Sequence, residues 1–201
     1  MGIRVITPST IEPITLAELK AQVRYDSSDE DALLQGAIAA ARAKAGNYTG
    51  TVIMRRTLEQ TLDEFPAAEF LVERTAAWNT GCNAECPIVI ESIQYVDPDG
   101  VTQTLSPSDY TLDTSVWPGW VLPGVDAEWP DTEPSANAVT VTLTIGYADE
   151  ADVPFDIRAW MLLTAAFLWT HREAFDLTGK MIDIPSRFVD SLLDPFRVPC
   201  V

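Results

Sequence analysis

The stretch VPFDIRAWMLLTAAFLWTHREAF, residues 153–175, predicts one long helix near the C-terminal end of the chain. Pro154 suits a first helical position, and Arg172 falls in the predicted last turn. From residue 159 to residue 169 every residue except Thr164 is apolar, so apolar side chains point all round the helix axis. The run is too short for a membrane span, which needs roughly 20 apolar residues. We therefore expect neighbouring subunits to complete the burial of this helix.

Two more helices are expected before it. Thr15 with Glu18 forms a capping box that opens a short helix, and Ser28 with Asp31 opens a second one. The apolar residues of the second helix recur at steps of three and four: Leu34, Ala37, Ile38, Ala41, Ala45 and Tyr48. This spacing predicts a single core-facing side, and the sequence AGNYTG predicts the end of the helix within residues 45–50.

The middle of the chain has the shorter period of strands. Strands are predicted in RTLEQTLDEF, in PIVIESIQYV with a bulge at residues 91–92, in residues 110–113 and 120–122, and in AVTVTLTIGY at residues 138–147. DPDG at residues 97–100 predicts a turn, after which VTQTL returns as the second arm of a hairpin. A short helix carrying Phe188, Val189, Leu192 and Leu193 is expected after the long one.

The predicted order is two helices, a β region and two helices, which indicates an α+β fold. We expect residues 1–56 and 153–201 to form one helical body, with residues 57–152 as an inserted antiparallel β region and residues 195–201 as an extended C-terminal tail. The N-terminus shows no signal-peptide pattern, so we expect a protein made in a cytoplasm.

Charge separates these two parts. The net charge is -17, and residues 57–152 hold eighteen acidic residues and one basic residue, Arg74. The remaining acidic and basic residues balance. Nucleic-acid binders neutralise phosphates with a basic patch, and the acidic β region is the opposite of one. The simplest interpretation of these acidic residues is that they lie on a solvated face.

Signatures of catalysis are mostly absent. The sequence has no Walker-type phosphate loop, no dinucleotide glycine pattern and no nucleophile elbow. Its one histidine, His171, is better suited to capping carbonyls or to an interface than to catalysis. Cys82 and Cys86 have no second ligand pair for zinc, since Cys200 stands apart. We expect no metal, no cofactor and no enzymatic activity.

Three other features have simple explanations. The turn at Asp97 and Asp99 lacks the later ligands of a calcium loop. A tryptophan group, Trp117, Trp120 and Trp129, is expected to pack on its own sheet or on a neighbouring subunit rather than to bind a sugar or peptide. An acidic group leaves a small hydrolase as a remote alternative: Asp149, Glu150 and Asp152. The better interpretation is that these residues lead into the long helix and complement its dipole.

Taken in order, the segments resemble one family. They are TPSTIEPITLAELKAQVR, SDEDALLQGAIAAARAKAGNYTG, LDEFP, PIVIESIQYVDPDG, SDYTLD and AVTVTLTIGYADEADVPFDIRAWMLLTAAFLWTHRE. The series is similar to the head–tail connector (adaptor, or head-completion) proteins of tailed phages and of phage-derived gene-transfer particles. One departure is residues 75–86, which are longer than the family pattern, so no contact is carried over there.

The resemblance implies a structural protein of the particle neck, assembled in the bacterial cytoplasm. It implies a homo-oligomeric ring, typically of twelve copies, that binds the portal protein and meets a tail-side terminator or stopper protein. DNA would pass through the ring without specific binding, and no membrane is involved. A tail or baseplate structural protein is the alternative.

Three sets of site residues follow from these expectations. The subunit interface is expected at Trp160, Leu163, Phe167 and Trp169. Portal contacts are expected from the C-terminal residues Phe188, Leu192, Phe196, Val198 and Val201, because the last three have no obvious partner within the chain. Acidic residues of the channel wall are expected at Asp97, Asp99, Asp126, Glu128 and Asp131, where carboxylates would repel phosphate and let DNA slide.

Overall fold

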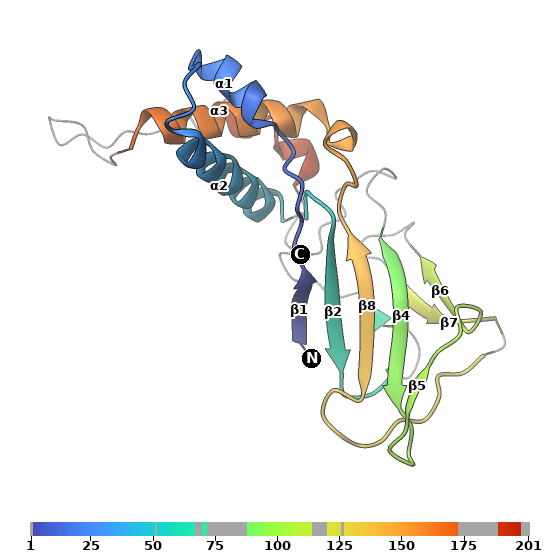
Figure 1. Ribbon diagram of the computed structural model, residues 1–201. Coiled ribbons are helices and arrows are strands. Elements are labelled where there is room, and N and C mark those ends of the chain that lie inside the picture. The colour runs from blue at the N-terminus through green and yellow to red at the C-terminus, as the bar shows by residue number, and fades with distance from the viewer. Residues whose placement is uncertain are drawn as a thin grey trace, which may run out of the picture.

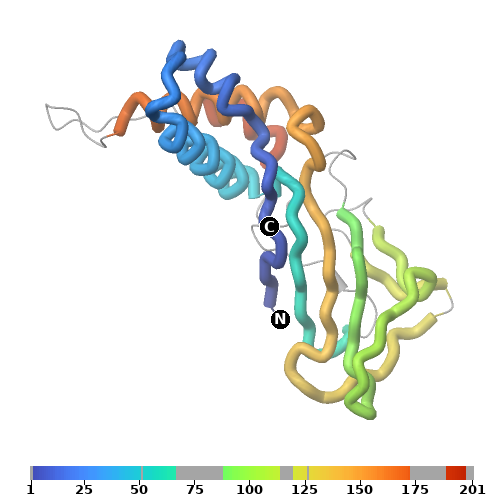
Figure 2. The backbone as a smooth tube through the Cα atoms, in the orientation of Figure 1, coloured from blue at the N-terminus to red at the C-terminus, as the bar shows by residue number. Residues whose placement is uncertain are grey.

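The computed structural model describes residues 2–50, 52–66, 70–71, 88–113, 120–125, 127–172 and 189–197. Its fold is α+β, as predicted from the sequence. The helices gather at one end of an elongated molecule, and the strands extend away from them (Figure 1). The chain path in Figure 2 shows the first strand lying beside the second at one edge of the larger sheet.

The first two helices are α1 (Leu16–Val23) and α2 (Asp31–Thr49). The predicted capping box of α1 is present: the backbone N–H of Glu18 donates to Thr15 Oγ1 at 3.1 Å, and the Glu18 carboxylate accepts from the Thr15 N–H at 2.7 Å. The predicted cap of α2 is wrong, since Glu30 and not Ser28 occupies the N-cap position. Gly50, at φ 71°, ends α2 where the sequence predicted.

Helix α3 (Phe155–Thr170) is shorter than the sequence predicted. A one-turn helix, η1 (Glu150–Asp152), precedes it, and Pro154 is the N-cap rather than the first helical residue. His171 leaves the helical conformation at φ -109° and ψ 86°, so Arg172 lies beyond the last turn. The strong apolar run ends at Trp169, and the C-cap residue His171 donates its N–H to the Phe167 carbonyl at 2.8 Å.

A five-stranded antiparallel sheet forms the larger part of the β region. Its spatial order is β1 (Gly2–Thr7), β2 (Arg56–Leu62), β8 (Val139–Ile145), β4 (Val89–Val96) and β5 (Thr102–Thr104). The predicted bulge is present, because the register with β8 shifts between Ile90 and Ser92. The predicted hairpin from β4 to β5 is also present. Strand β1 was not predicted.

A smaller sheet contains β3 (Phe70–Leu71), β7 (Trp120–Pro123) and β6 (Tyr110–Asp113), in that order. Residues of both sheets share one hydrophobic cluster, with Leu58, Ile93, Val121 and Leu143 all fully buried. Trp129 lies partly buried against this cluster and stacks on Phe65, with ring centroids 4.9 Å apart. Its packing role was predicted from the sequence, whereas Trp117 lies outside the described residues.

A second hydrophobic cluster holds the helices together. The α2 residues predicted to face the core, from Leu34 to Ala45, are buried in it, and Tyr48 packs against its edge. Residues 189–197 join the same cluster and include a second one-turn helix, η2 (Asp194–Phe196). Within the described residues, none of the helices combines the length and apolar character of a membrane span.

A tight crossing of two chain segments connects the helical layer to the sheet. The N–H of Tyr147 donates to the Ile53 carbonyl, and the N–H of Arg55 donates to the Tyr147 carbonyl, both at 2.9 Å. Gly146 adopts φ 110° here, and a Cβ on it would lie 2.6 Å from the Met54 carbonyl carbon. Only glycine meets both conditions, so this residue fixes the approach of the two segments.

Candidate interaction surfaces

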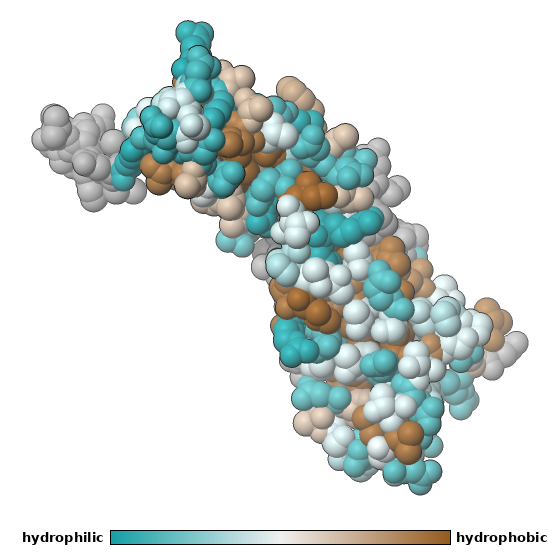
Figure 3. All heavy atoms as spheres, viewed as in Figure 1, coloured by the Kyte–Doolittle hydropathy of each residue, from teal (hydrophilic) through white to brown (hydrophobic). Residues whose placement is uncertain are grey.

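Helix α3 has one buried side and one exposed apolar row. The buried side consists of Ile157, Trp160, Met161, Thr164 and Ala165. The opposite row comprises Phe155, Ala159, Leu163 and Phe167, which follow one another at four-residue steps and which we call the α3 stripe. The α3 stripe is only partly covered by its own chain, with Phe155 80% and Leu163 41% exposed. Figure 3 shows that hydrophobic residues reach the surface over the helical layer.

Two of the four predicted interface residues lie in the α3 stripe. Leu163 is exposed and Phe167 is partly buried. Trp160 is a correction: it is 1% exposed, so no neighbouring copy can contact it. Its indole Nε1 donates to Asp190 Oδ1 at 3.0 Å, and the Lys44 ammonium lies 5.8 Å from its ring centroid. Trp160 therefore fixes the C-terminal segment onto α3 within one chain.

Trp169 is also used within the chain. Its indole Nε1 donates to Glu30 Oε2 at 2.8 Å, and its ring lies 5.3 Å from that of Tyr25. Arg172 Nη2 pairs with the same glutamate oxygen at 2.5 Å. This cluster anchors the end of α3 to the start of α2. His171 stacks on Phe167 at 4.3 Å and places Nδ1 3.2 Å from the Phe167 carbonyl oxygen, in line with the predicted capping role.

The C-terminal residues expected at the portal do not form an exposed apolar group in the described structure. Phe196 is 8% exposed, so its predicted exposure is wrong, and Leu192 packs against the helical cluster. The Tyr48 hydroxyl donates to Asp194 Oδ1 at 2.9 Å, and the Arg197 guanidinium lies 5.4 Å from the Tyr48 ring centroid. Phe188, Val198 and Val201 lie outside the described residues.

The acidic residues expected at the channel differ in their roles. Asp97 is a turn residue, because its carboxylate accepts from the N–H groups of Asp99 and Val101 and from Gln103 Nε2 at 2.9 to 3.1 Å. The Gln103 bond and then these backbone bonds hold the pKa of Asp97 below its usual value. Asp99, Glu128 and Asp131 are exposed, whereas Asp126 lies outside the described residues.

Within the described residues, the His, Cys, Asp and Glu side chains form no group of three or more that could hold a metal ion. Asp149 and Asp152 cap η1, with the Asp149 N–H donating to Asp152 Oδ2 at 3.3 Å, so this acidic group belongs to the approach to α3. Cys82, Cys86 and Cys200 lie outside the described residues.

The arrangement thus defines an α+β fold in which the helical layer presents an apolar row and the β region carries most of the acidic residues. Residues 13–106, just under half of the chain, match the family described as phage gp6-like head-tail connector protein. The resemblance to phage head–tail connectors that the sequence predicted is thereby confirmed. No curated protein matches the sequence.

Solved structures share the fold along the whole chain. A chain of the virion of a native gene transfer agent (GTA) particle matches with a TM-score of 0.73 and 19% identity, covering 100% of this chain and 97% of that one. A chain of the neck of an empty GTA particle, computed with C6 symmetry, matches with a TM-score of 0.71, 18% identity and the same coverage. The neck of a native GTA particle, computed with C12 symmetry, gives a TM-score of 0.67, 19% identity and the same coverage.

Proposed function

We propose that this chain is a structural head–tail connector subunit of a phage or phage-like particle. Copies assemble as a ring beneath the portal protein, join the DNA-filled capsid to the tail and continue the DNA channel. The match of residues 13–106 to the connector family carries this proposal. The fold shared over the whole chain with proteins of GTA necks and virions supports it and favours a place in the particle neck.

The α3 stripe supports ring formation. A row of apolar side chains with Phe155 80% and Leu163 41% exposed is unfavourable in water and is the kind of surface that a partner covers. The stripe runs along one side of one helix, so a neighbouring subunit can cover it by placing its own helical layer alongside. In a cyclic ring each copy both offers and receives such a contact. The symmetric necks in which the matching folds occur agree with this arrangement.

The two parts of the chain then have separate tasks. We propose that the helical body, α1, α2 and α3 with residues 189–197, makes the ring. The acidic β insertion of residues 57–152 forms the rest of the chain together with β1, which lies in the sheet and not in the helical body, where the sequence placed it. We propose that exposed carboxylates of the insertion, among them Asp99, Glu128 and Asp131, face the channel. Phosphate groups are repelled from such a wall, so DNA can move along it without binding.

Contacts with other neck proteins lie at the ends of the ring. We propose that residues 198–201, which follow the docked Arg197, bind the portal protein. The tail-side terminator or stopper protein meets the opposite end of the ring. The buried Phe196 stabilises the start of this C-terminal segment instead of contacting the portal itself.

Negative-stain microscopy of particles made without this chain tests the function. Connector loss leaves filled heads and separate tails, and supplying the purified chain restores joined particles. A tail or baseplate protein would instead leave complete necks on the heads, with the defect at the distal part of the particle. Intact, joined particles in the absence of the chain would contradict the proposal.

A further inference from the structure

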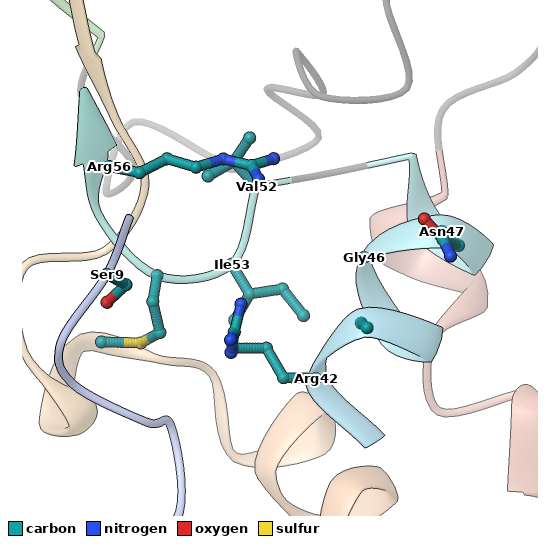
Figure 4. Close-up of a pocket in the computed structure, with 9 residues that line it drawn as sticks. Ser9, Arg42, Gly46, Asn47, Val52, Ile53 and Arg56 are labelled. Atoms are coloured by element: carbon teal, nitrogen blue, oxygen red, sulfur yellow. The ribbon is translucent and has the colours of Figure 1, made fainter. Parts of the chain in front are cut away.

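A pocket of about 160 Å³ lies where the helical layer meets the sheet. One wall comes from α2, the other from the segment that leads into β2, and Ser9 lies at its margin. Two arginines border it. Figure 4 shows Arg56 reaching across the opening from the start of β2, while Arg42 rises from α2 on the other side. The pocket is therefore bordered by two positive charges in a chain whose net charge is -17.

The two arginines differ in their hydrogen-bond partners. Arg42 already has a partner, since its Nε and Nη2 donate to the two carboxylate oxygens of Glu12 at 2.7 and 3.2 Å. Arg56 has none among the described residues, and its Nε is a buried donor without an acceptor. Burial, and then the positive charge of Arg42, lower the pKa of Arg56 below its usual value. Arg56 is only partly buried and lines the pocket, so its unpaired guanidinium is suited to an anion that enters from outside the chain.

We propose that this pocket binds a carboxylate side chain of a second copy of this chain, with Arg56 as its principal donor. The inference rests on the proposed function in one respect, namely that copies of the chain contact one another. The pocket volume admits one carboxylate group, and the planar guanidinium offers paired N–H donors that match the two carboxylate oxygens. This ionic contact would add specificity to an interface between subunits in which the α3 stripe makes the apolar contact.

A carboxylate is favoured over a DNA phosphate by the charge of the chain. Each copy carries 30 acidic and 13 basic residues, so every neighbour offers surplus carboxylates. DNA affinity depends on several phosphate contacts that together release counterions. This pocket supplies one uncompensated guanidinium inside an acidic molecule, which is too little for a polyanion.

The pocket can be tested on the full chain without any assembly. Arginine Nε resonances are followed by NMR while acetate, or in a separate arm inorganic phosphate, is added. We expect the Arg56 resonance to shift and saturate with acetate, while the resonance of exposed Arg55 does not. If the Arg56 resonance saturates with phosphate but not with acetate, the pocket binds phosphate, and its assignment to a carboxylate is overturned. No saturable change at Arg56 in either arm would overturn the site itself.

A second experiment tests the role of the pocket in assembly. Arg56→Gln is compared with Arg55→Gln, which removes the same charge from the adjacent, exposed residue that does not line the pocket. Self-association, measured by mass photometry with the portal protein present, is expected to weaken roughly tenfold or more for Arg56→Gln and to stay unchanged for Arg55→Gln. Equal association of both variants would contradict a carboxylate contact between copies. If the wild-type chain forms no assembly, the connector proposal fails, and the acetate titration still decides whether the pocket binds carboxylates.

Discussion

Arg158 on α3 donates a hydrogen bond to the carboxylate of Glu18, the same side chain that closes the capping box of α1. The Glu18 carboxylate thus accepts from the N–H of the α1 N-cap residue, which would otherwise be unpaired. The same carboxylate connects α1 to α3, which lies 140 positions later in the chain. The pair is about a third exposed, so its contribution to stability is modest and depends on salt.

The ionisation of Glu18 predicts an acid-sensitive contact. Burial opposes ionisation, but the hydrogen bonds from Thr15 and the charge of Arg158 outweigh it and lower the pKa of Glu18 below its usual value of 4.5. Because the folded pKa is the lower one, this stabilisation is present above about pH 4.5 and is lost as the pH falls through the folded value.

Urea unfolding of the wild type and of Glu18→Gln at neutral pH and at about pH 3 measures this effect. The wild type is expected to lose more stability on acidification than Glu18→Gln, whose amide does not titrate. Glu128→Gln removes an exposed carboxylate and serves as the control with a wild-type pH dependence. Identical acid responses of wild type and Glu18→Gln would show that the capping carboxylate does not contribute.

At Gly146, we expect the addition of one methyl group to destabilise the fold strongly. In Gly146→Ala the new Cβ would meet the Met54 backbone at 2.6 Å in a conformation with φ 110°. We expect a loss of roughly 2 kcal/mol or more in the free energy of unfolding. Gly36→Ala is the matched control, because nothing lies within 4 Å of its Cβ and alanine favours the helix interior, so its stability should rise slightly. A neutral Gly146→Ala would mean that the crossing of the two segments can relax.

Truncation at two points separates folding from portal binding. A chain ending at Arg197 keeps Phe196 in the helical cluster and should retain the wild-type melting temperature, while losing portal binding in a pull-down. A chain ending at Asp194 removes Phe196, which is 8% exposed, and should melt at a clearly lower temperature. Full portal binding by the chain that ends at Arg197 would contradict the role proposed for residues 198–201.

The parts of the fold that the sequence predicted are those with local signals. The capping box at Thr15 and Glu18, the α2 core residues, the β4 bulge and the turn at residues 97–100 each depend on residues close together in the chain. Alternating apolar residues in β8 face the core at every second position, so the strand is visible without any partner.

The errors arose where distant residues decide the structure. Strand β1 is largely exposed and shows no buried alternation. Only its pairing with the distant strand β2, for example Gly2 with Thr61, makes it a strand. Phe196 was expected to be exposed because its partners are remote, as the bond between Tyr48 and Asp194 across 146 positions illustrates. The apolar run of α3 indicated burial on all sides, yet local pattern alone could not show which side its own chain covers.

The side of α3 left exposed gives the most direct test of ring assembly. Leu163→Asp places a charge in the α3 stripe at a residue that is 41% exposed, so the monomer should still fold. Leu33→Asp makes the same change at a leucine of α2 that is 55% exposed and lies outside the stripe. Mass photometry and negative-stain microscopy, with the portal protein present, then count the copies in each assembly. We predict rings for the wild type and for Leu33→Asp, and folded subunits without rings for Leu163→Asp, because a charge buried in an apolar contact is unfavourable. Complete rings of Leu163→Asp would contradict the claim that the α3 stripe joins the subunits.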